Sequence, residues 1–136
     1  MTNASKEYSV RRERCEMNYD KSKITSAGKK PEFSFDQVKT DDKSLIPVIV
    51  QDDDTDEVLM LAYMNREAYE LTLERGVMTY YSRSRQELWL KGDTSGHYQY
   101  VRSLALDCDL DTMLARVEQV GAACHTGRHS CFFNEI

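Results

Sequence analysis

The stretch YQYVRSLALDCDLDTMLARVEQVG, residues 98–121, alternates apolar and polar side chains over most of its length. A period of two is typical of a β-strand with one buried face, so we expect a strand that runs to Asp111 and a second strand in TMLARVEQVG. If residues 101–111 are extended, alternation places four side chains on one face of the first strand, those of Leu104, Leu106, Cys108 and Leu110. The opposite face then carries three carboxylates, those of Asp107, Asp109 and Asp111.

The segments before this stretch predict a hairpin, a helix and a further pair of strands. LIPVIVQ (45–51) and VLMLAYM (58–64) are typical of strands and are joined by the acidic turn DDDTDE. In NREAYELTLERG, Asn65 can cap a helix and Gly76 can end it. VMTYYSR and ELWLKG are typical of strands on either side of the polar turn SRSRQ. The sequence therefore predicts an α+β fold with a mostly antiparallel sheet and one main helix.

Charge divides the chain into two parts. The 136 residues carry a net charge of −5, yet residues 1–30 hold eight lysines and arginines against four acidic residues. We expect residues 1–30 to be a basic, flexible leader and residues 31–136 to form a single domain. The acidic domain does not suit a protein that must neutralise nucleic-acid phosphates.

The apolar runs and the cysteines indicate the cellular compartment of the protein. The longest apolar run, residues 58–64, is too short to span a membrane, and no apolar stretch follows Met1. We interpret the four cysteines as thiols or metal ligands rather than as a disulfide framework. These features predict a cytoplasmic protein without a membrane partner.

The aspartates at the end of the predicted strand form a candidate cation site. Three like charges on one face repel one another, and a hard cation such as Mg²⁺ would relieve that repulsion. The alternative is a strand end that runs into solvent, where the repulsion is screened, and spacing alone leaves both open. An EF-hand calcium loop also fits these aspartates together with Glu118, but Thr112 stands where that loop needs glycine. We therefore reject the EF-hand.

Three cysteines form a candidate zinc site: Cys108, Cys124 and Cys131. Their spacing is not that of a CxxC knuckle, but the last two lie in GAACHTGRHSC, a flexible polar segment rather than a core strand. Three thiolate ligands would leave a fourth position open for water, whose pKa zinc lowers to about 7. The alternative is a structural site that His125 or His129 closes as a fourth ligand.

Three motifs in this order resemble the phosphoribosyl-AMP cyclohydrolase family of histidine biosynthesis: WLKGDTSGHYQYV (89–101), DCDLD (107–111) and ACHTGRHSCF (123–132). The likeness runs from about Leu45 to Phe133 and leaves the basic leader outside. Asp93 stands where the family often has glutamate, a change that keeps the negative charge.

The resemblance implies a hydrolase that opens the adenine ring of N1-(5-phosphoribosyl)-AMP at its N1–C6 bond, by attack of zinc-activated water. The product would be the formimino-imidazolecarboxamide ribotide intermediate of histidine biosynthesis. The resemblance also implies an intertwined homodimer with one zinc and one magnesium site per subunit. When the motifs are matched to those of the family position by position, the implied zinc ligands are Cys124, Cys131 and Cys108 of the partner subunit. The magnesium ligands are Asp107, Asp109 and Asp111.

We expect two histidines and several polar residues to serve this reaction. His125, next to Cys124, and His97 are candidates for the general acid or base. The two phosphates of the substrate would be held, with Mg²⁺, by Lys91, Thr94 and Ser95. Arg83 and Arg85 are further candidates for phosphate binding, and the alternative for them is a solvated turn. The alternative to an enzyme is a structural zinc module that mediates protein contacts. A nucleic-acid binder, which would depend on the basic leader, ranks third.

Overall fold

The computed structural model of the chain describes residues 18–136. Its elements in chain order are the 3-10 helices η1 (Lys21–Lys23) and η2 (Phe35–Gln37), then β1 (Ile46–Asp52), β2 (Val58–Met64), α2 (Arg66–Arg75), β3 (Thr79–Ser82), β4 (Glu87–Leu90), β5 (Gln99–Leu106) and β6 (Met113–Gln119). Within this described part, no helix has the length and apolar character needed to cross a membrane.

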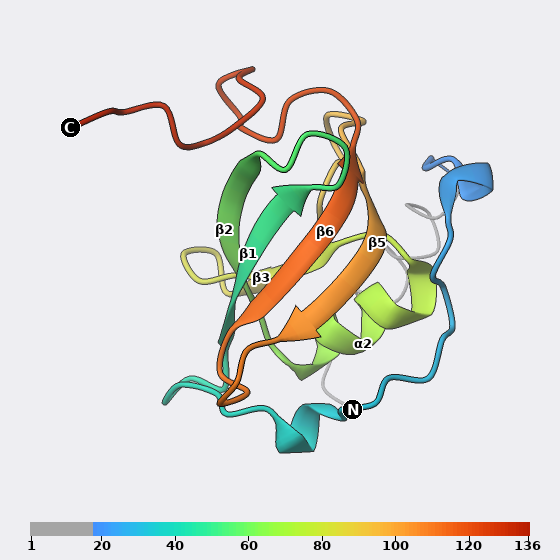
Figure 1. Cartoon of the computed structure of the whole chain (residues 1–136), viewed down its shortest axis with the longest axis vertical. Helices are drawn as coiled ribbons and strands as arrows, with labels where there is room; N and C mark the ends of the chain where they lie inside the picture. The colour runs from blue at the N-terminus through green and yellow to red at the C-terminus, as the bar shows by residue number, and fades with distance from the viewer. Residues whose placement is uncertain (1–17) are drawn as a thin grey trace.

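The strands form a four-stranded sheet and a separate two-stranded hairpin. The sheet order is β2-β1-β6-β5, and β3 pairs with β4. The pairing of β1 with β6 is parallel, and the other three pairings are antiparallel. Helix α2 lies behind the sheet in Figure 1 and contacts β2, β3 and β4. The predicted α+β class, with a mostly antiparallel sheet and one main helix, is confirmed.

Helix α2 begins and ends where the sequence predicts. The Asn65 side chain accepts a hydrogen bond from the Ala68 amide, one of the amides that a helix N-terminus leaves without a partner. Gly76 is left-handed, with φ of 77°, and its amide bonds to the Thr72 carbonyl. A Cβ at Gly76 would lie 2.7 Å from the Ile24 side chain, so glycine also lets the N-terminal segment approach the helix end.

Strand β5 is shorter than predicted. It ends at Leu106, and residues 107–112 form a turn that leads into β6. In this turn the Asp107 amide bonds to the Thr112 carbonyl, and the Asp107 carboxylate accepts from the Asp111 amide. Aspartate favours turns because its short side chain can bond to nearby backbone amides. The prediction that Cys108 and Leu110 continue the face of Leu104, with the aspartates opposite, is therefore wrong.

The sheet face opposite α2 carries an apolar row. Strand register places four side chains next to one another across the sheet, those of Leu61, Ile49, Leu114 and Ala105. Leu61 is 46 % and Leu114 is 36 % exposed. This face is turned to the viewer in Figure 1. An exposed apolar row of this kind is typical of a contact surface.

The N-terminal segment from residue 18 packs against the domain. The Gly28 amide donates to the Leu73 carbonyl over 2.8 Å, and Arg102 Nη1 donates to the Lys23 carbonyl over 3.0 Å. The predicted domain boundary at residue 31 stays a prediction. The first 17 residues of the predicted leader lie outside the described residues.

Candidate functional site

Two of the three candidate zinc ligands lie together. Cys124 is buried and Cys131 is partly buried, and their thiols interact with each other and with the Lys91 ammonium group. The loop of residues 120–131 that contains both is closed by backbone hydrogen bonds, including one from the Cys124 amide to the Arg128 carbonyl. The Cys131 amide donates to the Leu59 carbonyl over 2.7 Å, which fixes this loop to the beginning of β2.

Hydrogen bonding and burial make the two thiols unequal. The Thr126 hydroxyl donates to Cys124 Sγ over 3.0 Å and holds the pKa of Cys124 below its ordinary value, with Lys91 adding to the effect. Burial raises the pKa of Cys131, and the neighbouring Cys124 raises it further. Lys91 Nζ donates to the Ala123 carbonyl over 2.5 Å, and burial lowers the pKa of this lysine. A readily formed thiolate beside a second thiol suits a soft metal ion such as zinc.

His129, one of the two histidines considered for closing a zinc site, contacts two carboxylates instead. Its Nε2 lies 3.2 Å from Asp52 Oδ2, and its Nδ1 bonds to Glu57. Next to it, Ser130 Oγ donates to the Val58 carbonyl over 2.7 Å. These contacts join the 120–131 loop to the turn between β1 and β2. The sequence carries no signal for them because the partners are far apart along the chain.

Asp107, Asp109 and Asp111 also come together, through the turn and not through strand alternation. Their carboxylates offer ligand atoms within 4.8 Å of one another, and all three residues are exposed. Contacts with the carboxyl groups of Asp111 and Asp107 raise the pKa of Asp109. Crowded carboxylates either retain a proton or bind a cation, so this oxygen-only set fits a hard divalent ion.

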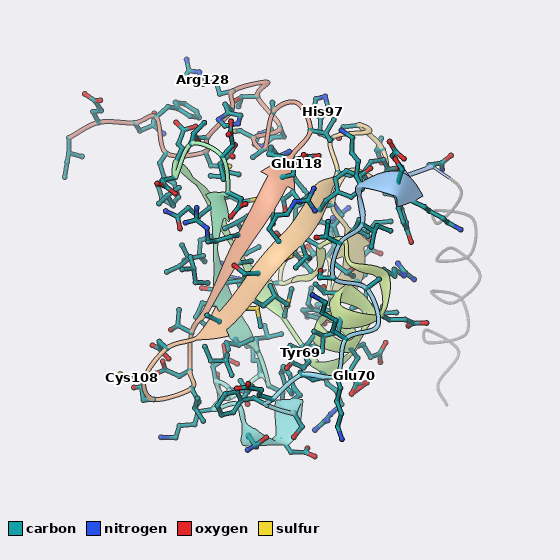
Figure 2. The ribbon with its side chains drawn as sticks, turned by 45° about the vertical axis from the view of Figure 1, so that its right-hand side comes forward. Tyr69, Glu70, His97, Cys108, Glu118 and Arg128 are labelled. Atoms are coloured by element: carbon teal, nitrogen blue, oxygen red, sulfur yellow. The ribbon has the colours of Figure 1, made fainter. Side chains whose placement is uncertain are left out.

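Cys108 lies far from the other two thiols. It is exposed on the turn between β5 and β6. Figure 2 shows it at the opposite end of these strands from His97 and Arg128, which belong to the region of the other two cysteines. A single chain thus brings Cys124 to Cys131 but does not bring Cys108 to either.

The loop of residues 91–97 adjoins the thiols through Lys91 and holds His97 in a defined position. A Cβ at Gly92 would lie 2.6 Å from the Tyr98 amide nitrogen, so the loop closes tightly at its base. Within the loop, the Ser95 hydroxyl accepts from the His97 amide over 3.1 Å. The imidazole covers Gly121, where a Cβ would lie 2.5 Å from the ring. The predicted residues Lys91, Thr94, Ser95 and His97 are therefore on one loop that meets the 120–131 loop.

A chain of hydrogen bonds that the sequence analysis missed leads from the core to this loop. The Tyr80 hydroxyl donates to Gln99 Oε1, and Gln99 Nε2 donates to Gln119 Oε1 over 2.8 Å. Gln119 Nε2 in turn donates to the Val120 carbonyl over 2.9 Å and to the His97 carbonyl over 3.4 Å. The sequence signal was a polar residue, Gln99, within an otherwise apolar strand start.

The remaining predicted site residues are placed differently. Arg83 stacks on the Tyr63 ring at 3.9 Å, and Arg85 lies 3.5 Å from Glu87. Both arginines are in the turn between β3 and β4, and β4 separates them from Lys91. His125 is exposed in the 120–131 loop.

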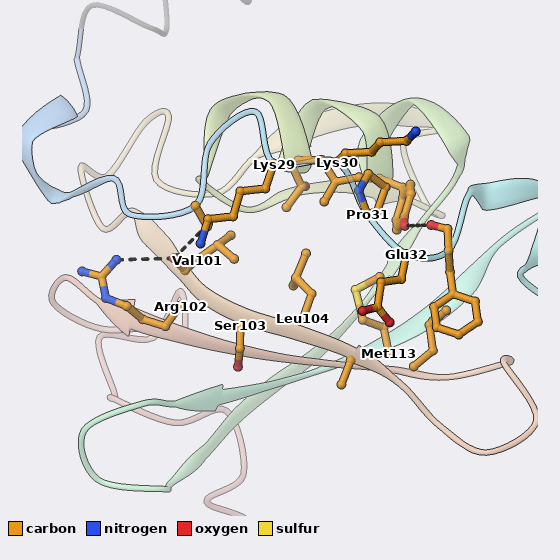
Figure 3. A pocket seen from close by; sticks show the side chains of 16 residues that line it. Lys29, Lys30, Pro31, Glu32, Val101, Arg102, Ser103, Leu104 and Met113 are labelled. Carbon is orange, nitrogen blue, oxygen red and sulfur yellow. Dashed lines mark hydrogen bonds between the residues drawn. The ribbon is translucent and has the colours of Figure 1, made fainter.

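A cavity of about 490 Å³ lies elsewhere, between residues 26–33, α2 and β5 (Figure 3). Its lining includes the apolar side chains of Leu104 and Met113 and the basic residues Lys29 and Lys30. It contains none of the candidate metal ligands, histidines or phosphate-binding residues. The candidate site is therefore the junction of the 91–97 and 120–131 loops, and not this cavity.

Comparison with known proteins agrees with the motifs at this junction. A family model described as phosphoribosyl-AMP cyclohydrolase matches residues 60–133. The matched range contains the 91–97 loop, the aspartate turn and both cysteines of the 120–131 loop.

Individual relatives match over most of the chain. A Streptococcus mutans protein named phosphoribosyl-AMP cyclohydrolase is 71 % identical over 92 residues, which cover 68 % of this chain and 84 % of that protein. A protein of the same name from Bifidobacterium adolescentis is 62 % identical over 96 residues, which cover 71 % of each chain. The histidine biosynthesis bifunctional protein HisIE of Thermoanaerobacter pseudethanolicus is 57 % identical over 100 residues, which cover 74 % of this chain and 46 % of that protein.

Proposed function

Because the chain belongs to the phosphoribosyl-AMP cyclohydrolase family, whose members are enzymes of histidine biosynthesis, we propose that it opens the adenine ring of N1-(5-phosphoribosyl)-AMP by hydrolysis of the N1–C6 bond. The observation that carries the proposal is the thiol pair of Cys124 and Cys131, set beside Lys91 within the range that matches the family model. Water adds its oxygen to C6, the N1–C6 bond breaks, and the two protons of the water pass to N1 and to the exocyclic nitrogen. The exocyclic amine then remains on C6 as part of a carboxamide.

The thiol pair is the part of this chain that would hold zinc. Thr126 and Lys91 favour the thiolate of Cys124, which is the ligand form of cysteine. Cys131 would bind next to it, and Cys108 of the partner subunit would complete the set. A zinc ion in such a site supplies hydroxide at neutral pH, because it lowers the pKa of bound water to about 7.

Two histidines are the proposed acid–base groups. His97 is held between Ser95 and Gly121, so its ring has a defined position at the loop junction. His125 is exposed next to Cys124. One of them would take a proton as water attacks C6, and one would supply the proton that N1 gains.

The substrate phosphates need positive charge and hydrogen-bond donors. We propose that Thr94, Ser95 and the amides of their turn bind one phosphate. Mg²⁺ held by Asp107, Asp109 and Asp111 would bind oxygens of the second phosphate. Lys91 is buried with the thiols, so it would act on them and not on an outer phosphate. Arg83 and Arg85 are engaged with Tyr63 and Glu87, and a phosphate contact would require them to leave these partners.

A homodimer would unite the parts of the site that one subunit separates. Figure 2 shows Cys108, which is on the same turn as the aspartates, at one end of the sheet, and Arg128, which is on the loop of the thiol pair, at the other. The apolar row of Leu61, Ile49, Leu114 and Ala105 supplies a face on which two sheets can pack in opposite directions. Each aspartate turn would then meet the thiol pair of the other subunit.

Turnover of phosphoribosyl-AMP by the purified protein, with and without a zinc chelator, tests the proposal. We expect turnover that the chelator abolishes and that added zinc restores. A folded dimer loaded with zinc and magnesium that shows no turnover would contradict the proposed reaction. If zinc removal also unfolds such an inactive protein, the structural zinc module becomes the better description.

A further inference from the structure

The N-terminal segment of residues 18–24 packs into a buried cluster that also contains the two residues flanking the 91–97 loop. This small cluster, separate from the main core, contains Tyr19 from this segment together with Val77, Leu90, Tyr98 and Tyr100. Leu90 immediately precedes the loop, and Tyr98 immediately follows it. The Tyr19 and Tyr98 rings pack edge to face, with centroids 5.8 Å apart. Tyr19 therefore contacts the residue that follows the loop and shares a buried cluster with the residue that precedes it.

Polar contacts fasten the same segment to β5 and β6. The Asp20 amide donates to the Tyr100 hydroxyl over 2.8 Å. Lys23 Nζ lies 5.8 Å from the centre of the Tyr100 ring and 3.4 Å from Glu118 Oε2. Arg102 joins these groups, because it lies 3.5 Å from Glu118 Oε1 and also donates to the Lys23 carbonyl.

The segment faces the loop across a hollow and does not cover its tip. This hollow, of about 520 Å³, has Asp20 and Lys23 on one side and Thr94 and Ser95 on the other. The hydroxyls proposed to bind phosphate therefore remain accessible. The segment can affect them through the end of the loop.

We infer that residues 18–24, which lie outside the range matched by the family model, brace the 91–97 loop and thereby set the affinity for the substrate. Tyr19 and Lys23 are positioning residues in this inference. It rests on the proposed function, in which Thr94 and Ser95 bind a substrate phosphate. A loop whose ends are fixed loses less conformational freedom when it binds a ligand, so loosening those ends weakens binding more than it slows the chemical step.

Two variants and two matched controls test the brace in the full chain. Tyr19→Ala removes the ring that packs on Tyr98, whereas Tyr19→Phe retains it. Lys23→Gln removes the charge beside Tyr100 and Glu118, whereas Lys21→Gln removes a charge from an exposed neighbour in the same 3-10 helix. Two quantities are measured for each: the steady-state constants KM and kcat, and hydrogen exchange of the amides of residues 92–98.

We expect Tyr19→Ala to raise KM roughly three- to tenfold with kcat within about twofold of the original, and to speed exchange of the loop amides. Lys23→Gln should shift both quantities in the same direction by a smaller amount. Lys21→Gln should match the original protein, and Tyr19→Phe, which keeps the ring on Tyr98, should stay closer to it than Tyr19→Ala does. A merely structural role would lower the melting temperature and the active fraction without changing KM.

Each outcome decides a separate point. Unchanged exchange at residues 92–98 in Tyr19→Ala overturns the brace, whether or not the protein is active. Faster exchange with an unchanged KM overturns its role in substrate affinity. An original protein without turnover contradicts the proposed function, and the exchange measurement still decides whether the segment braces the loop.

Discussion

At the scale of single residues, Gln99 joins the core to the candidate site. Its side chain is fully buried, accepts from the Tyr80 hydroxyl and donates to Gln119, which in turn bonds to the carbonyls of His97 and Val120. A buried side-chain amide needs hydrogen-bond partners. A buried polar group without a partner destabilises the folded state by more than one hydrogen bond stabilises it. The same bonds fix the backbone where the 91–97 loop ends and where the 120–131 loop begins.

Replacing Tyr80 by phenylalanine tests this chain of hydrogen bonds. Tyr80→Phe leaves Gln99 Oε1 buried without its donor, and we expect the free energy of unfolding to fall by about 1–3 kcal/mol. Denaturant unfolding at neutral pH measures the change. Tyr81→Phe, on the neighbouring and more exposed residue of β3, serves as the control and should change stability by less than about 0.5 kcal/mol. Equal stability of the two variants would show that the Tyr80 hydrogen bond is unimportant.

The same residue predicts how stability depends on alkaline pH. Burial raises the pKa of Tyr80 well above its ordinary value of about 10, so the folded protein keeps a proton that the unfolded chain loses near pH 10. Above that pH the unfolded state binds fewer protons, and the free energy of unfolding must fall as pH rises. In Tyr80→Phe this decline should be shallower. Denaturant unfolding of both proteins at several pH values between about 8 and 11 measures the free energy of unfolding. Equal slopes of this free energy against pH in the original protein and in Tyr80→Phe would contradict the prediction.

At the scale of elements, local sequence signals set the ends of α2, whereas the end of β5 depends on the turn chemistry that follows. Asn65 and Gly76 bound the helix as predicted. The alternation of residues 107–111 matches a strand, but the Asp107 carboxylate bonds to the Asp111 amide and the backbone turns. Side-chain bonds within the turn therefore prevail over the periodic pattern, and they bring the three carboxylates closer together than a strand would.

The helix cap gives a prediction at this scale. Asn65→Ala removes the acceptor of the Ala68 amide, so we expect a loss of about 1 kcal/mol in the free energy of unfolding. Asn65→Asp keeps a side-chain oxygen at the same position and should retain most of the stability. Thermal or denaturant unfolding of both variants measures the difference. A loss of the same size in Asn65→Asp would mean that the cap acts through something other than the acceptor oxygen.

At the scale of the whole molecule, the parts of the proposed zinc site lie at two ends of one sheet. Cys108 is exposed at one end, and the 120–131 loop with Cys124 and Cys131 lies at the other, where Figure 2 shows Arg128 of this loop. The apolar row on the open face of the sheet offers a surface for a second copy in the reverse direction. A site shared between two chains in this way would make activity a property of the proposed dimer and not of one chain.

Mixing two inactive variants tests the shared site. In a mixed dimer of Cys108→Ser with Cys124→Ser, one site lacks both thiols, and the other site has all three. After the subunits of equal amounts exchange, half of the dimers are mixed, so we expect about a quarter of the original turnover to return. Mixing Cys124→Ser with Cys131→Ser is the control, because every site then lacks one thiol. No recovery in the first mixture, with subunit exchange shown by a mass difference, would contradict a site formed across the dimer.

Features that depend on neighbours in the chain could be predicted from the residues alone. The period of two predicted the strands, and Asn65 and Gly76 predicted the helix ends, since both signals act within a few residues. The closeness of Asp107, Asp109 and Asp111 also followed from their spacing, although a turn and not a strand produces it. The three motifs further identified the family, because their residue types and order are specific.

The tertiary structure alone decided the contacts between residues far apart in the chain. It placed Lys91 against Cys124 and Cys131, His129 between Asp52 and Glu57, and Tyr19 on the end of the 91–97 loop. It also separated Cys108 from the other two thiols, which no spacing rule predicts from one chain. Such contacts depend on which sheet edges and loops meet when the apolar faces are buried. Many chain paths satisfy the same local pattern, and the packing of the core selects one of them.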